Sequence, residues 1–218
     1  MSGVRDYLAW HEKYNDPGSS LPRRLALVRE VLRAELDARP GPVRVVSLCA
    51  GDGRDILGVL AEREDAARVS VTLVEVLPQL VERARDAAAA NVAAEVEVVT
   101  ADAGCSATYT ALATVPADVV LLVGVLGNIN DGDVAATVAA MPCLCAPGAT
   151  VVWTRGRSLD GAEDFVSPVR EAFSAAGFTE VSIRSFDVKD DRTALGVVRY
   201  HGPPAPFGPR ETWFTFVG

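Results

Sequence analysis

Three short segments of the sequence place glycines or a lone carboxylate at the end of a run of apolar residues. The turn Gly51-Asp52-Gly53 follows the apolar residues 43–48, Glu75 lies near the end of the next run, and Asp102 follows the third. Glycine lets the backbone lie close to a ligand, and carboxylate oxygens accept hydrogen bonds from hydroxyls and amines. This order predicts a nucleoside site, with backbone beneath the ligand, Glu75 on the ribose hydroxyls and Asp102 on the amino group of the base.

The segments between these residues alternate between strand and helix patterns. Strands are predicted over 43–48, 69–76, 95–99, 118–123, 149–153, 179–186 and 194–201, and helices over 55–63, 78–90, 131–141 and 165–176. Such alternation predicts a doubly wound, mostly parallel α/β sheet of seven strands. The short charged turn 189–192 makes the last two strands antiparallel, and residues 212–217 are expected to add an edge strand. The carboxyl ends of parallel strands share one edge of a sheet, which brings the three segments together.

A helical extension is predicted to precede this sheet. Apolar residues recur at steps of three and four from Leu21 to Leu36, which gives one apolar helix face, and Arg39-Pro40-Gly41-Pro42 ends that helix. The length of 218 residues suits one α/β domain. We therefore expect an extension over residues 1–40 and a ligand-binding domain over residues 41–218.

The bulk composition excludes several classes of function. A net charge of −8 argues against nucleic-acid binding. No apolar stretch is long enough to cross a membrane, and the polar N-terminus lacks the apolar run of a secretory signal, so we expect a cytoplasmic protein. The cysteines do not have the spacing of a zinc site and are expected to be free thiols, without a bound metal: Cys49, Cys105, Cys143 and Cys145.

Residues 45–55, together with Glu75, Asp102 and residues 118–128, resemble the nucleoside-binding series of the class I S-adenosylmethionine (SAM)-dependent methyltransferases. The resemblance covers roughly residues 43–156. It implies a Rossmann-like fold, SAM as the cofactor, the glycine turn against the methionine part, Glu75 on the ribose and Asp102 on adenine. It also implies that residues 124–128 form the loop beneath the methyl donor, and that residues 1–40 form a lid whose polar residues contact the cofactor carboxylate or the acceptor. The implied cofactor-binding residues are Tyr14, Ser20, Arg24, Ser47, Cys49, Ala50, Gly51, Asp52, Gly53, Glu75, Val76, Asp102, Ala103, Gly124 and Asn128.

The function that the resemblance implies is methyl transfer to a small-molecule acceptor by a monomer or homodimer. Methyl transfer is an in-line displacement in which positioning does much of the work. No catalytic residue can be identified from spacing: His11 and His201 are open candidates for a base, and Asp131 for a polar contact. Residues 155–164 are expected to be a loop that contributes to acceptor recognition.

Two alternatives remain open on the sequence. Ser47 stands where family members often have an acid and Cys49 where they often have glycine, which leaves a non-catalytic SAM- or nucleoside-binding module possible. A neutral serine makes a weaker contact with an amino group than a carboxylate does. An enzyme that uses NAD is less favoured, because Ile56 stands where the third glycine of a dinucleotide fingerprint is expected.

Overall fold

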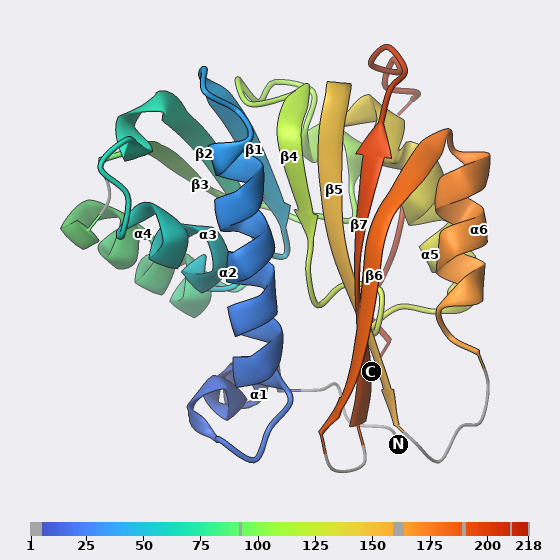
Figure 1. Ribbon diagram of the computed structural model, residues 1–218, viewed down its shortest axis with the longest axis horizontal. Helices are drawn as coiled ribbons and strands as arrows, with labels where there is room; N and C mark the ends of the chain where they lie inside the picture. Colours follow the sequence, from blue (N-terminus) through green and yellow to red (C-terminus); the bar gives the residue numbers. More distant parts are fainter. Residues whose placement is uncertain (1–5, 92, 159–163, 189–190, 210, 218) are drawn as a thin grey trace.

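The computed structural model describes residues 6–91, 93–158, 164–188, 191–209 and 211–217, and a sheet of seven strands forms its centre (Figure 1). The strands are β1 (Val43–Leu48), β2 (Val69–Glu75), β3 (Glu95–Thr100), β4 (Ala117–Leu122), β5 (Cys145–Ser158), β6 (Phe178–Val188) and β7 (Asp191–Tyr200). The α-helices are α1 (Tyr7–Glu12), α2 (Leu21–Asp37), α3 (Arg54–Leu60), α4 (Pro78–Asn91), α5 (Asp131–Ala140) and α6 (Ser167–Ala175).

The strand order β3-β2-β1-β4-β5-β7-β6 confirms the predicted doubly wound sheet. The strands from β3 to β5 are parallel, whereas β7 is antiparallel to both of its neighbours. The chain leaves β1 toward β2 on one side and later returns to β4 on the other side. This reversal opens a crevice at the carboxyl ends of β1 and β4, where open α/β sheets bind their ligands.

Alternate residues of the central strands pack against helices on both faces of the sheet. Val45 belongs to a core shared with α2, α3 and α4, whereas its neighbour Val46 belongs to a second core shared with α5 and α6. Because both faces are covered, the strands consist of almost continuous apolar residues, as expected for a parallel sheet. α2 contributes Val28, Leu32 and Leu36 to the first core. The division into a lid over residues 1–40 and a domain over 41–218 stays a prediction.

Strand β5 is longer than predicted. It extends to Ser158, because the residues after Trp153 continue to pair with β7, from Thr154 opposite Leu195 to Ser158 opposite Asp191. The expectation of a loop from Arg155 onward is therefore wrong for residues 155–158. Residues 159–163 of that segment, and residues 189–190 of the turn between β6 and β7, lie outside the described residues.

The prediction of an edge strand at residues 212–217 is wrong. This C-terminal tail makes one isolated bridge, between Thr212 and Cys105, and then crosses the end of the sheet. The backbone N–H of Trp213 donates to the carbonyl of Gly104, and that of Val217 donates to the carbonyl of Asn128. The apolar rings that gave the strand-like pattern are buried against the loops after β3 and β4 instead of pairing with a neighbouring strand.

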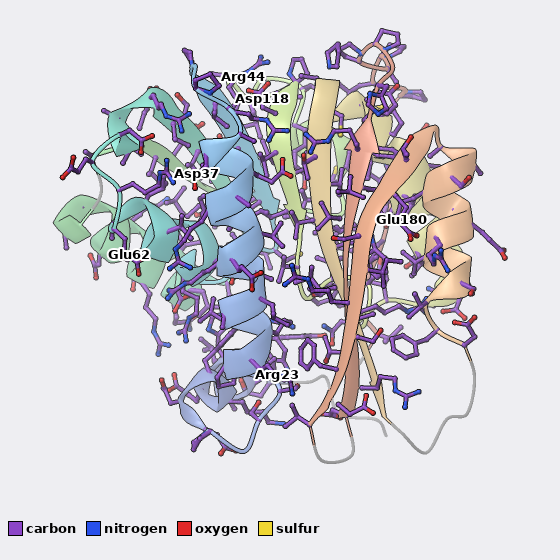
Figure 2. The ribbon with its side chains drawn as sticks, viewed as in Figure 1. Arg23, Asp37, Arg44, Glu62, Asp118 and Glu180 are labelled. Atoms are coloured by element: carbon purple, nitrogen blue, oxygen red, sulfur yellow. The ribbon has the colours of Figure 1, made fainter. Side chains whose placement is uncertain are left out.

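One ionic contact joins β1 and β4 away from the carboxyl ends of these strands. Arg44 of β1 donates to Asp118 of β4 with both its backbone N–H and its guanidinium, at 2.8 and 3.4 Å (Figure 2). None of the helices in the described part of the chain is long and apolar enough to cross a membrane. Within those same residues, no group of three or more His, Cys, Asp or Glu side chains is arranged to hold a metal ion.

Candidate functional site

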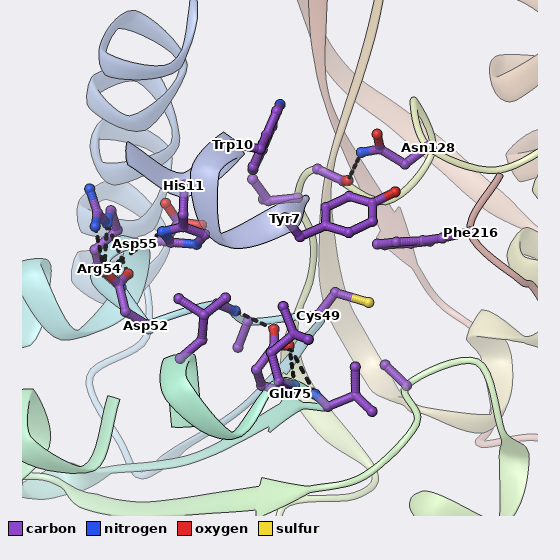
Figure 3. Close-up of a pocket in the computed structure, with 18 of the residues that line it drawn as sticks. Tyr7, Trp10, His11, Cys49, Asp52, Arg54, Asp55, Glu75, Asn128 and Phe216 are labelled. Carbon is purple, nitrogen blue, oxygen red and sulfur yellow. Dashed lines mark hydrogen bonds and ion pairs between the residues drawn. The ribbon is translucent and has the colours of Figure 1, made fainter. Parts of the chain in front are cut away.

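A cavity of about 380 Å³ lies at the carboxyl ends of the central strands, within the range of small-molecule sites. Its wall contains twelve of the residues predicted from the sequence: Tyr14, Arg24, Cys49, Ala50, Gly51, Asp52, Glu75, Val76, Asp102, Ala103, Gly124 and Asn128. Figure 3 shows α1 on one side of this cavity, with Cys49 and Glu75 on the opposite side. The structure thus brings together segments that are far apart in the sequence.

The turn after β1 adopts a left-handed backbone. Gly51 and Gly53 have φ angles of 61° and 72°, and Cys49 has a φ of 50°, where a residue with a side chain is strained. A Cβ atom on Gly51 would lie 2.3 Å from Nε2 of His11, so α1 packs directly on this turn. Burial raises the pKa of the Cys49 thiol well above its usual range, with Glu75 and Asp102 acting in the same direction, so the thiol stays protonated.

Glu75 is buried at the end of β2 and organises the backbone around it. Oε2 accepts from the N–H of Gly51 at 2.8 Å, and Oε1 accepts from the N–H groups of Val76 and Leu77, both at 2.9 Å. A carboxylate has about four acceptor positions, so Oε2 keeps one for a ligand. These contacts hold the carboxylate against the glycine turn without any ligand.

Asp102 and Val76 form the neighbouring part of the wall. Oδ1 of Asp102 accepts from the N–H of Gly104 at 2.8 Å, which fixes the carboxylate and leaves Oδ2 available. Val76 is 57% exposed, one of few large apolar side chains in the described residues that are not covered. An exposed apolar side chain beside a fixed carboxylate fits a flat ring with a polar edge, such as a nucleobase.

The short helix α1 covers the cavity with aromatic side chains. Tyr7, Trp10 and His11 all line it. Burial lowers the pKa of His11, while the nearby Asp52, 3.9 Å from Nδ1, opposes this effect. His201 is exposed and does not line the cavity. Of the two histidines considered as bases, only His11 therefore faces the site.

Charged residues gather at the α3 end of the cavity. Arg54 forms an ion pair with Asp52, and its guanidinium lies 4.3 Å from the centre of the Tyr14 ring. Arg24 is buried and donates from Nη2 to the hydroxyl of Tyr14 at 2.6 Å. Although burial acts to raise it, the pKa of Asp52 is lowered by its hydrogen bonds with Arg54. Burial raises the pKa of Asp55, with Arg24 the strongest opposing charge.

The C-terminal tail closes the opposite end of the cavity. Phe214, Thr215 and Phe216 line it, and the ring of Phe216 lies 5.1 Å from that of Tyr7 in α1 (Figure 3). The N–H of Thr215 donates to Asp133 of α5 at 2.9 Å, which fixes the tail in place. α1 and residues 214–216 therefore meet over the site.

Three predicted site residues lie elsewhere. Ser47 is buried within β1, and Gly53 is packed beneath Leu57 and Leu73, so both support the turn from behind. Ser20 lines a second, adjacent cavity of about 540 Å³, which shares a wall with the first. Their part in cofactor binding stays a prediction.

Several residues of the wall were not predicted from the sequence. These are Tyr7, Trp10, Arg54 and Asp55, together with the C-terminal tail. Trp10 lies in the predicted lid and Asp55 at the end of the segment 45–55 that contains the glycine turn. Their positions in the sequence could therefore have indicated that they belong to the site. The tail carried no such signal, because its aromatic alternation is also typical of a strand. Asp131, the other polar candidate, pairs with Arg155 and does not line the cavity.

No family model matches the chain, and no curated protein matches it in sequence. Solved structures do match in fold. Magnesium protoporphyrin IX methyltransferase from Synechocystis PCC 6803, with bound S-adenosylhomocysteine (SAH), is 13% identical, with 92% of this chain and 90% of that chain covered and a TM-score of 0.66. The N-methyltransferase NodS from Bradyrhizobium japonicum WM9 is 17% identical, with 87% and 99% covered and a TM-score of 0.58.

A third match is the cyclopropane synthase MmaA2 from Mycobacterium tuberculosis. It is 9% identical, with 86% of this chain and 88% of that chain covered and a TM-score of 0.63. At such identities the likeness concerns the fold and not the acceptor. The seven-stranded sheet with its antiparallel β7 is thus that of the class I SAM-dependent methyltransferase fold.

Proposed function

We propose that this protein is a SAM-dependent methyltransferase that acts on a small-molecule acceptor. The observation that carries the proposal is that Glu75 and Asp102, from the ends of two adjacent strands, line one cavity with the turn at Gly51. The resemblance in sequence assigned these three positions to ribose, adenine and the methionine part of SAM. The fold shared with methyltransferases supports the same assignment.

The residues present fit an adenosine group. Oε2 of Glu75 has an acceptor position for a ribose hydroxyl, and Oδ2 of Asp102 has one for the amino group of adenine. The adenine ring would cover the exposed Val76, and burying that side chain favours binding by about 1–2 kcal/mol. SAM, when bound, supplies a methyl group activated by its positive sulfur.

Residues of the chain would position the acceptor and exclude water from the cavity. Tyr7 and Trp10 of α1, with Phe216 of the tail, cover the cavity with apolar surface. Gly124 is held by a hydrogen bond from its N–H to Thr154 at 2.8 Å, and Asn128 donates to the carbonyl of Gly124 at 2.6 Å. This rigid loop after β4 is suited to hold an acceptor in line with the donor.

We assign no general base to the described residues. His11 is held against Gly51, at the end of the cavity where the resemblance places the methionine part, so we infer that it packs on the turn and does not take a proton from the acceptor. An acceptor that is nucleophilic without losing a proton needs no base. The cytoplasmic location and the monomer or homodimer stay predictions from the sequence.

Calorimetry with SAM and SAH tests the proposal. We expect both ligands to bind with one site per chain, and the Glu75→Ala variant to lose binding. Absence of binding by the intact protein would remove the proposal.

A non-catalytic SAM-binding module is the second candidate, favoured by one observation. The side chain of Cys49 enters the cavity wall at a strained position that glycine occupies more easily. Transfer of labelled methyl groups from SAM to a metabolite extract distinguishes the two candidates. Turnover by the wild-type protein rejects the module, whereas SAM binding without any turnover favours it.

A further inference from the structure

Three buried polar atoms without a hydrogen-bond partner gather around one end of the cavity. Among the described residues these include Nδ1 of His11, Nε of Arg24 and Oδ1 of Asp55, and all three side chains line the cavity. Folded proteins rarely leave buried polar atoms unpaired, and each such atom calls for an explanation. Their common position indicates that a polar ligand completes this end of the site.

Two of the three groups carry opposite charges that do not meet. In the part of the chain described here, neither Arg24 nor Asp55 has an oppositely charged group within 4.0 Å. Arg24 is nevertheless the strongest charge acting to lower the pKa of Asp55. Both side chains line the cavity, Arg24 from α2 and Asp55 from α3, and they form no ion pair with each other.

The remaining charged groups at this end already have partners. Asp52 and Arg54 form an ion pair with each other, and Arg29 of α2 donates to the backbone carbonyl of Arg54. Burial keeps His11 neutral at physiological pH by lowering its pKa. A buried polar atom without a partner is costly, so Arg24 through Nε and Asp55 through Oδ1 are the two charged groups that gain most from a ligand.

We propose that Arg24 and Asp55 form a site for an amino-acid group, with the guanidinium of Arg24 on its carboxylate and the carboxylate of Asp55 on its ammonium. The inference rests on the proposed function, because SAM ends in such a group. It assigns to Asp55, at the start of α3, the charge that Ser47 does not provide, since Ser47 is buried in β1 away from the cavity. Hydrogen bonds between charged partners are the strongest ones available to such a ligand.

Three probes that differ only at this end separate the two contacts. SAH carries both the carboxylate and the ammonium, its decarboxylated form carries the ammonium alone, and 5′-methylthioadenosine carries neither. Calorimetry is carried out with each probe on the wild type, Asp55→Asn and Arg24→Gln. Glu180→Gln, which removes an exposed charge on β6 (Figure 2), is the matched control for a loss of charge.

Asp55→Asn is expected to weaken SAH and the decarboxylated form by about 10- to 100-fold, the effect of a charge-assisted hydrogen bond, and to leave methylthioadenosine unchanged. Arg24→Gln is expected to weaken SAH alone by a similar factor. Glu180→Gln is expected to bind all three probes as the wild type does. Equal losses for all three probes, or no loss for SAH, would overturn the inference while leaving the proposed function intact.

The wild type alone provides a second test that does not depend on the folding of a variant. Affinity should rise from methylthioadenosine to the decarboxylated form and again to SAH, by about tenfold at each step. Equal affinities for the three probes would contradict the site. Failure of both SAH and methylthioadenosine to bind would instead reject the proposed function, and the inference with it.

Discussion

At one end of the cavity Glu75 accepts three hydrogen bonds from the backbone, whereas at the other end Arg24 and Asp55 each keep a buried polar atom without a partner. The end with Glu75, where we propose that adenosine binds, is thus ordered before any ligand arrives, and its geometry follows from strand ends. The charged end is held by packing between α1, α2 and α3 and keeps buried polar atoms without a partner. We infer from this difference that the first end fixes the position of a ligand and the second discriminates by charge.

The largest effect is expected from Glu75→Ala. It leaves the N–H of Gly51 without its buried acceptor and releases two others, so the free energy of unfolding should fall by about 2–4 kcal/mol. SAH binding should weaken at least about 100-fold. Urea unfolding and calorimetry measure the two effects. Glu97→Ala, an exposed glutamate of β3, should change stability by less than about 0.5 kcal/mol. A stable Glu75→Ala variant with normal SAH affinity would show that Glu75 neither orders the glycine turn nor holds the ligand.

Gly51→Ala tests the contact between the glycine turn and His11 of α1. A methyl group there meets His11 and occupies a backbone with φ of 61°, so stability should fall by about 1–3 kcal/mol. Adding His11→Ala should restore part of the loss, because it removes the steric conflict and leaves the backbone strain. Gly41→Ala, with no atom within 4 Å of the new methyl group, is the control and should be neutral. If His11→Ala restores nothing, α1 does not pack on the turn.

Asp102→Ala should have a smaller effect, mainly on binding. Asp102 is exposed and makes one backbone contact, so we expect a stability loss under about 1 kcal/mol but an SAH affinity about tenfold weaker. The comparison of adenosine with inosine sharpens this test, since inosine lacks the amino group. Wild type should prefer adenosine, and Asp102→Ala should lose that preference. An unchanged preference would place the base elsewhere.

The smallest expected effect is a pH dependence from His11. Its pKa in the folded protein lies below the usual 6.5, so its contribution to stability is complete above pH 6.5 and is lost as the pH falls through the lowered value. Urea unfolding at pH 7.5 and pH 5 should therefore show a smaller acid loss in His11→Gln than in the wild type. His201→Gln, at an exposed position, should behave as the wild type. Equal acid losses in all three proteins would show that burial of His11 does not perturb its titration.

The end of the cavity with Glu75 could be predicted from the sequence, whereas most of the charged end could not. Glu75 and Asp102 follow short apolar runs, and the carboxyl ends of parallel strands must share an edge, so local pattern sufficed to place them together. The seven strands and their antiparallel closing pair followed from the same patterns. Ten of the fifteen predicted site residues lie at or just after the ends of these strands and line the cavity for this reason.

The charged end and the tail depend on contacts that no local pattern encodes. Asp55 faces the cavity because α3 begins directly after Gly53, and Arg24 reaches it only because α2 packs on the sheet. The tail alternates aromatic residues as a strand does, yet Phe216 packs against both Tyr7 and Phe214 across the end of the sheet. Tertiary packing overrode the local pattern at both places.

A crystal structure of the protein with SAH would locate each part of the ligand. We expect the ribose within hydrogen-bond distance of Glu75 and the adenine edge at Asp102. We also expect the carboxylate of SAH at Arg24 and its ammonium at Asp55. A ligand bound outside this cavity, or with its ribose away from Glu75, would show that Glu75 and Asp102 do not form a nucleoside site.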